Sequence, residues 1–169
     1  MNKTNDITLQ EIAKILKAER SSMLRYASYR LGDKDDAEDV LQDVFLKLHS
    51  RLSAPEELHI QDLRSYLFRS LSNICTKWLS QTSRLKTVPI DTIVEQTGTT
   101  TDDKNEDDYK RIVQLLAKIP EEQAEVIRLR IYGNNSFAEV ADILSLPLPT
   151  VKSRFLYGLE KIRKSMKQH

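Results

Sequence analysis

The sequence predicts an all-α protein of two small helical domains joined by a flexible acidic linker. Glycine and proline are scarce, with 4 and 5 among 169 residues, and this favours long helices over a fold with many tight turns. Apolar residues recur at helical spacing through residues 1–80 and again through residues 109–169. Residues 81–108 lack that period and are rich in acidic side chains, which is typical of a linker.

The first domain, residues 1–80, is predicted to contain four helices. Thr8 and Glu11 form a capping box that opens the first helix. The second helix covers about residues 19–31 and ends at Gly32, a common residue after a helix C-terminus. The third helix has the most regular apolar stripe: Ala37, Val40, Leu41, Val44, Phe45 and Leu48. Pro55 separates it from a fourth helix over about residues 62–80, which is basic on its polar side.

The second domain, residues 109–169, is predicted to end in a helix-turn-helix. Helices are expected over residues 109–119 and 120–132, the latter closed by Gly133. Ser136 and Glu139 form a second capping box, which opens a helix over residues 136–144. After a short turn the last helix covers about residues 149–166, and such a second helix commonly lies in the DNA major groove. A helical hairpin with a merely solvated basic face fits the same pattern.

The net charge differs between the two predicted domains and the linker. Residues 1–80 are neutral, residues 81–108 carry a net charge of −4, and residues 109–169 carry +5, which together give the overall +1. The basic end indicates nucleic acid as a partner. The near-neutral total predicts that the free chain binds DNA weakly.

Several functional classes lack their sequence signatures. Cys75 is the lone cysteine, so no internal disulfide is expected and a reducing cytoplasm is favoured. The three histidines are scattered, which argues against a metal site, and no cofactor is expected. There is no secretory signal and no apolar run of about 18 residues, so membrane insertion is not expected. Neither a phosphate-binding glycine loop nor a catalytic triad pattern occurs, so we do not expect an enzyme.

Two sets of motifs resemble one family, the extracytoplasmic-function sigma factors of bacterial RNA polymerase. Residues 119–123 (IPEEQ), 136–144 (SFAEVADIL) and 150–155 (TVKSRF) resemble their region 4. Residues 32–45 (GDKDDAEDVLQDVF) and 65–73 (SYLFRSLSN) resemble their region 2. The resemblance implies a sigma factor that binds core RNA polymerase and directs initiation at promoters by recognising −10 and −35 DNA elements. It also implies control by an anti-sigma factor, often membrane-anchored.

The resemblance assigns roles to three groups of residues. Core-polymerase binding falls to Asp39, Gln42, Asp43 and the adjacent Lys47, although these could also be an ordinary solvated surface. The −10 element would meet Arg64, Arg69, Ser72, Asn73 and Lys77, together with the loop over residues 51–61. The −35 element would meet Thr150, Lys152, Ser153, Arg154, Tyr157 and Lys161.

Three further features of the sequence bear on these roles. Tyr66 and Trp78 could stack on bases, but their spacing favours the core for Tyr66 and leaves Trp78 open. Lys77 stands where the family commonly has aspartate. Ser145 stands where glycine is usual, which predicts a mildly strained turn.

Three other functions remain as alternatives. A stand-alone helix-turn-helix repressor or activator would use only the second domain and usually dimerises. It would leave the acidic third helix and the basic fourth helix without a role. A polymerase-binding regulator that does not initiate has no distinguishing sequence feature, and an enzyme lacks its motifs.

Overall fold

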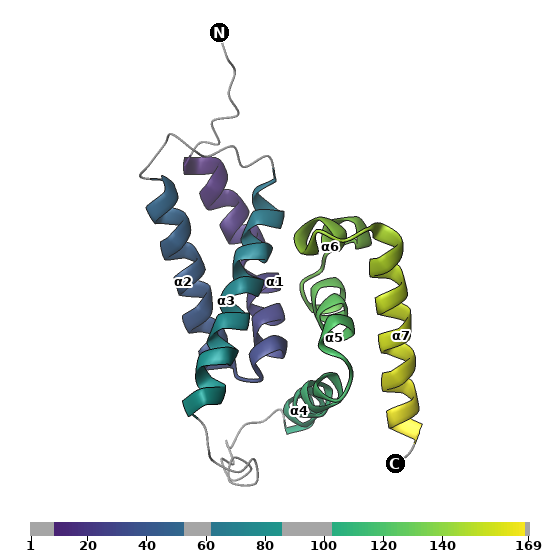
Figure 1. Ribbon diagram of the computed structural model, residues 1–169. Coiled ribbons are helices and arrows are strands. Elements are labelled where there is room, and N and C mark those ends of the chain that lie inside the picture. Colours follow the sequence, from purple (N-terminus) through teal and green to yellow (C-terminus); the bar gives the residue numbers. More distant parts are fainter. Residues whose placement is uncertain (1–8, 53–61, 86–102, 168–169) are drawn as a thin grey trace.

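The computed structural model describes residues 9–52, 62–85 and 103–167, and every regular element in those ranges is a helix. The elements are α1 (Leu9–Leu31), α2 (Lys34–Leu52), α3 (Leu63–Leu85), α4 (Asp103–Ala117), α5 (Glu121–Ile127), the π-helical turn η2 (Arg128–Tyr132), α6 (Phe137–Leu144) and α7 (Leu148–Lys167). Helices α1–α3 form one bundle (Figure 1). Beside it, α5 and α6 lie between the bundle and α7, which is the outermost helix (Figure 1).

The α1–α3 bundle has one helix fewer than predicted. The first two expected helices are a single continuous α1, because Lys17 and Ala18 at the expected break are good helix formers. The predicted stop is confirmed at Gly32, whose φ of 74° is a left-handed conformation that glycine adopts without strain. Its N–H donates to the Ser28 carbonyl at 2.9 Å, which closes the helix.

The predicted apolar stripe of α2 is confirmed, since five of its six residues are buried and Phe45 packs against them. On α3 the apolar stripe consists of the buried Leu63, Leu67, Leu71 and Ile74, with Tyr66 and Trp78 partly buried beside them. Phe68 and Cys75, which lie outside that stripe, are fully buried as well. Helix α3 is therefore covered on two sides, by the other bundle helices and by α5 to α6.

The helices extend into the segment that the sequence assigned to the linker. Residues 81–85 continue α3 and residues 103–108 belong to α4, so the expected linker is helical at both ends. Short amphipathic extensions of this kind are stabilised by tertiary packing, which a local pattern does not reveal. The remaining residues, 86–102, lie outside the described part, and the flexibility of the linker stays a prediction.

The helix-turn-helix is formed by α6 and α7. At its start, the Ser136 hydroxyl accepts from the Glu139 N–H at 3.1 Å while the Glu139 carboxylate accepts from the Ser136 N–H at 3.1 Å. The predicted capping box is therefore confirmed. The helix expected over residues 120–132 is α-helical only as far as Ile127. Its last five residues, Arg128–Tyr132, form the wider π-helical turn η2. Buried Asn135 supports that wider turn by donating its amide N–H to the Leu129 carbonyl at 2.9 Å.

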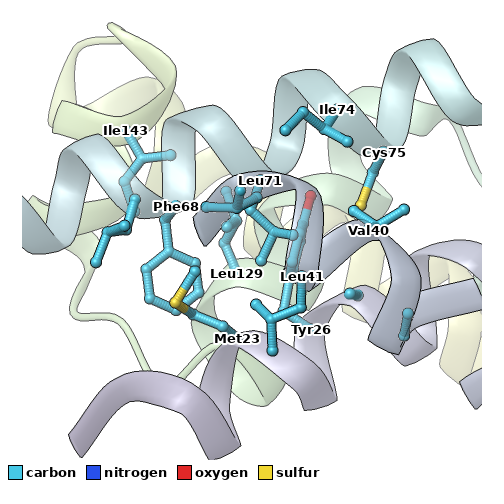
Figure 2. Close-up of a cluster of buried hydrophobic side chains, with 14 of the residues drawn as sticks. Met23, Tyr26, Val40, Leu41, Phe68, Leu71, Ile74, Cys75, Leu129 and Ile143 are labelled. Carbon is cyan, nitrogen blue, oxygen red and sulfur yellow. The ribbon is translucent and has the colours of Figure 1, made fainter. Parts of the chain in front are cut away.

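One hydrophobic core joins the bundle to the α4–α7 unit. Leu129 of η2 and Ile143 of α6 belong to the same buried cluster as Phe68 and Leu71 of α3. Figure 2 shows these side chains gathered between the helices, with Met23 of α1 beside them. A second, smaller cluster around Leu116 and Ile127 holds α4, α5 and α7 together. The two halves of the chain are thus packed against each other.

The turn between α6 and α7 carries the predicted strain. Ser145 has φ 54° and ψ 48°, a left-handed conformation that disfavours residues with a Cβ atom. We expect Ser145→Gly to raise the free energy of unfolding by about 0.5–1 kcal/mol, since the relief of left-handed strain in the folded state exceeds the cost of the higher conformational entropy that glycine gives the unfolded chain. Urea unfolding measures the change. Ser153→Gly, in the interior of α7, is the control and should destabilise the protein by about 0.5 kcal/mol, the difference in helix propensity between serine and glycine. A loss of stability in Ser145→Gly would contradict the interpretation.

Candidate nucleic-acid interface

The outer face of α7 presents the residues expected to contact the −35 element. Val151 on the inner face is buried, and Phe155 is partly buried against Phe137 of α6, with ring centroids 5.1 Å apart. The opposite face exposes Lys152, Ser153, Tyr157 and Lys161, whereas Thr150 and Arg154 are half-buried. Leu156 on the same face is 65% exposed. This mixture of hydrogen-bond donors and apolar groups is suited to contact base edges in a DNA major groove.

Arg154 lies at the border of that face. One of its terminal nitrogens lies 3.7 Å from a carboxylate oxygen of Glu122 on α5. The Glu122 side chain is 74% exposed, so this ion pair is weak and leaves the guanidinium free to exchange partners. The arginine can therefore reach a phosphate at the flank of the helix.

A second face, on α2, carries the residues expected to bind polymerase. Asp39, Gln42, Asp43 and Lys47 are all exposed. Among them stands Leu46, a large apolar side chain that is 68% exposed and was not predicted as a site residue. The signal was available in the sequence, because Leu46 lies off the stripe of α2 that contains the buried Leu41 and Leu48.

An open groove runs between α2 and α3. One hollow of about 390 Å³ is lined by Arg51, Tyr66, Ser70 and Asn73, and a second of about 340 Å³ by Asp43, Leu46, Lys77, Trp78 and Gln81. Lys47 and Ile74 line both hollows, so the groove is continuous. Tyr66 and Trp78 pack against the core on one side and border the groove on the other, with the Arg51 guanidinium 5.3 Å from the Tyr66 ring centroid.

The five α3 residues expected at the −10 element do not share one surface. Asn73 and Lys77 are exposed beside the α2–α3 groove. The other three side chains, those of Arg64, Arg69 and Ser72, point to a different contact. We call this contact the seam; in it, helices α1 and α3 meet residues 121–143. There they make hydrogen bonds to the α4–α7 unit. The second domain covers part of α3 in this arrangement, and the assignment of the five residues to the −10 element stays a prediction.

Buried charges at the seam were not predicted. Glu125 of α5 is 8% exposed. It accepts from the Tyr26 hydroxyl, and from the Ser72 hydroxyl at 3.0 Å. Arg30 Nε and Arg128 lie 3.4 and 3.2 Å from its other oxygen. Burial, with the nearby Glu125 carboxylate, raises the pKa of the Tyr26 phenol well above its usual value and that of the Cys75 thiol to about 12. Glu125 lies in a stretch rich in charged residues, so its sequence neighbours gave no sign of burial.

Within the described helices, none is long and apolar enough to cross a bilayer. The residues whose side chains are described also contain no cluster of three or more histidine, cysteine, aspartate or glutamate side chains able to hold a metal ion. The candidate surfaces are therefore the α7 face, the α2 face and the α2–α3 groove. The loop expected to complete the −10 pocket lies mostly outside the described residues.

Comparison with known proteins identifies the family. Two family models match the chain, "Sigma-70 region 2" over residues 15–85 and "Sigma-70, region 4" over residues 115–164. The RNA polymerase sigma-E factor of Streptomyces coelicolor is 27% identical over 158 residues, covering 92% of this chain and 86% of that protein. The ECF RNA polymerase sigma factor SigK of Mycolicibacterium vanbaalenii is 27% identical over 143 residues, covering 80% and 71%.

Two solved structures have the same fold. CnrH, in complex with the cytosolic domain of CnrY, matches with a TM-score of 0.66 at 19% identity, over 95% of this chain and 90% of that one. RpoE of Bartonella quintana, in complex with the anti-sigma factor NepR, matches with a TM-score of 0.66 at 18% identity, over 94% and 98%.

The chain belongs to the sigma-70 family of RNA polymerase sigma factors, and the region 2 match lies within α1–α3 while the region 4 match extends from the end of α4 into α7. Within that family it is an extracytoplasmic-function sigma factor, as its sequence motifs indicated. Its function is promoter-specific initiation of transcription.

Proposed function

We propose that the chain works by binding alone, with one surface for core polymerase and two for promoter DNA. The observation that carries the −35 assignment is the α7 face, where Lys152, Ser153 and Tyr157 are exposed above a buried Val151. An α-helix with such a face fits the major groove, and its N-terminal residues would meet base edges. Thr150 and Lys161 extend the contact along the helix, and Arg154 would bind phosphate.

The α2 face is the proposed polymerase surface. Asp39 and Asp43 lie one helical turn apart and are exposed together with Gln42. Leu46 follows on the same side and adds an exposed apolar contact, while Lys47 borders the groove. Charged residues around an exposed apolar side chain are typical of a protein–protein contact. Leu46 therefore joins the residues expected from the sequence.

The α2–α3 groove is the proposed site for the non-template strand of the −10 element. Asn73 offers hydrogen bonds to an unpaired base, and Lys47, Arg51 and Lys77 supply positive charge beside it. Trp78 borders the same groove and could stack on a base. Arg64, Arg69 and Ser72 would extend the contact once the seam opens.

The proposal includes a cytoplasmic location and an anti-sigma partner. The solved structure of RpoE contains the anti-sigma factor NepR, and that of CnrH contains the cytosolic domain of CnrY. A protein of the same kind, often membrane-anchored, would bind this chain and keep it from polymerase. We propose neither an enzymatic activity nor a cofactor.

Reconstituted transcription tests the proposal. The full chain and core polymerase from the source bacterium are combined on genomic fragments, and transcript start sites are mapped. Initiation should require the chain. It should fall about tenfold or more with Lys152→Ala and Arg154→Ala combined, since each base or phosphate contact contributes about 1–3 kcal/mol. Lys110→Ala, Arg111→Ala removes two exposed basic residues of α4 and is the control for net charge.

The other outcomes separate the alternatives. Specific DNA binding by the chain alone, without initiation, would favour a stand-alone repressor or activator. Polymerase binding without initiation on any fragment would favour a non-initiating regulator. Equal losses in both double variants would contradict the assignment of α7 as the reading helix.

A further inference from the structure

Leu156 is a large apolar side chain on the outer face of α7. It is 65% exposed, and among the described large hydrophobic side chains only Leu46 of α2 is more exposed. Burial of apolar area stabilises a fold in proportion to the area removed from water, so this leucine contributes little to stability. Single exposed leucines are common on protein surfaces, and the position of Leu156 on the helix therefore decides whether it has a function.

The packing of α7 fixes the direction in which Leu156 points. Val151 and Gly158 are buried on the inner side of the helix. A Cβ atom added to Gly158 would lie 2.7 Å from Cδ1 of Ile127 on α5, so the two helices are in close contact there. Leu156 lies two residues before Gly158 and five after Val151, which places it on the opposite side of an α-helix. Because α7 is the outermost helix (Figure 1), this side is open to solvent.

The neighbours of Leu156 are polar groups that can contact DNA. Lys152 and Ser153 lie one helical turn before it, Tyr157 directly follows it, and all three side chains are exposed. Within the described part of the chain, none of these three side chains makes a hydrogen bond or an ion pair. Leu156 is thus an aliphatic group in the middle of a surface of unoccupied hydrogen-bonding groups.

Thymine is the base that such an aliphatic group can recognise. In the major groove the bases present distinct patterns of donors and acceptors, and thymine alone carries a methyl group. A leucine cannot hydrogen-bond to a base edge, but it can remove that methyl group from water in an apolar contact. An α-helix rises about 1.5 Å per residue and stacked bases are about 3.4 Å apart, so Lys152 and Leu156 reach bases roughly one or two steps apart.

We propose that Leu156 selects a thymine in the −35 element by contact with its 5-methyl group. This inference rests on the proposed function of the α7 face. Lys152 and Ser153 contact the hydrogen-bonding edges of neighbouring bases, and Leu156 adds an apolar contact that the other three bases lack. The promoters that this chain recognises therefore contain a thymine, on either strand, within the −35 element.

Removing one methyl group from the DNA tests this contact. Uracil presents the same hydrogen-bonding edge as thymine, so a thymine-to-uracil substitution deletes the methyl group alone. The wild-type chain should lose about fourfold in affinity at one −35 thymine, which is the effect of one buried methyl group. In Leu156→Ala the same DNA substitution should have no effect, because the partner of the methyl group is already absent.

The experiment uses the full chain bound to core polymerase and a promoter mapped in the reconstituted assay. Each thymine of the −35 element is replaced by uracil in turn, on both strands, and the holoenzyme concentration that gives half-maximal promoter binding is measured. Both proteins are compared on both DNAs, which isolates the pairwise contact, since an effect of uracil on DNA shape appears equally in each protein. Leu156→Ala should bind the thymine promoter about fourfold more weakly than the wild type and the uracil promoter equally well.

Two variants are controls for that comparison. Met166→Ala removes another exposed apolar side chain of α7, ten residues after Leu156 and 47% exposed, and should keep the wild-type affinities for both DNAs. Lys152→Ala should bind every promoter more weakly and yet keep the difference of about fourfold between thymine and uracil, because it removes a donor and not the methyl contact. Circular dichroism confirms that each variant is folded.

Three results would overturn the proposal: a −35 element with no thymine whose methyl group affects binding, a methyl effect that persists in Leu156→Ala, or a methyl effect that is also lost in Met166→Ala. The second result would mean that Leu156 contacts another part of the DNA or the polymerase. Failure of the methyl contact is distinct from failure of the proposed function. In that case the wild-type chain would still initiate with core polymerase, and the combined Lys152 and Arg154 variant would still weaken initiation.

Discussion

Phe68→Ala is expected to lower the free energy of unfolding by about 3–5 kcal/mol, as for other large-to-small substitutions of a buried phenylalanine. The Phe68 side chain is fully buried, and its ring meets that of Tyr26 edge to face at a centroid distance of 6.2 Å. The Arg64 guanidinium lies 5.2 Å from the ring centroid on α3 itself. Alanine would leave a cavity between region 2 and region 4, lined by groups from both.

Urea unfolding followed by the fluorescence of Trp78, the single tryptophan, measures this loss. Phe45→Ala is the matched control, since Phe45 is only partly buried on α2 and lies outside the seam. The control should lose distinctly less stability. If Phe68→Ala costs less than about 1 kcal/mol, a value typical of surface or partly exposed sites, region 4 is not packed on α3 in solution.

Local patterns were sufficient to predict most helices and the helix-turn-helix. The α2 stripe and the Ser136 capping box depend only on residues within a few positions of each other, so the sequence contains the full signal. The extra break predicted near residues 17–18 was wrong, because Lys17 and Ala18 both favour a helix and α1 continues through them. No glycine or proline stands there.

The seam could not be predicted for a different reason. Phe68 lies off the main stripe of α3, so its burial depends on η2 and α6, which follow about 60 or more residues later. Glu125 is charged, and the charged Glu121, Glu122 and Arg128 lie three or four positions from it, which is typical of an exposed helix face, yet three elements supply its partners. Such long-range contacts produce no periodic pattern in the local sequence. For the same reason, Arg64 and Arg69 were identified as basic DNA-facing residues without the contacts that now engage them.

Reversing the charge of the α2 face is the second large effect that we expect. Asp39→Lys combined with Asp43→Lys should weaken binding to core polymerase about 100-fold or more, because like charges placed in a contact cost several kcal/mol. Both side chains are exposed, so the fold should tolerate the change. The assay is equilibrium binding of the labelled chain to core polymerase without DNA, together with initiation in the reconstituted system.

The control for that variant must add the same positive charge elsewhere. Asp107→Lys combined with Glu160→Lys does so at two exposed positions of α4 and α7, outside the proposed polymerase surface. It should bind core polymerase as the wild type does. Because Leu46 is 68% exposed beside the two aspartates, Leu46→Ala should weaken binding as well, by about tenfold if it is a buried anchor of the contact. Wild-type affinity in the Asp39, Asp43 variant would move the polymerase surface away from α2. An equal loss of polymerase affinity in the control variant would show that the effect comes from net charge and not from the α2 surface.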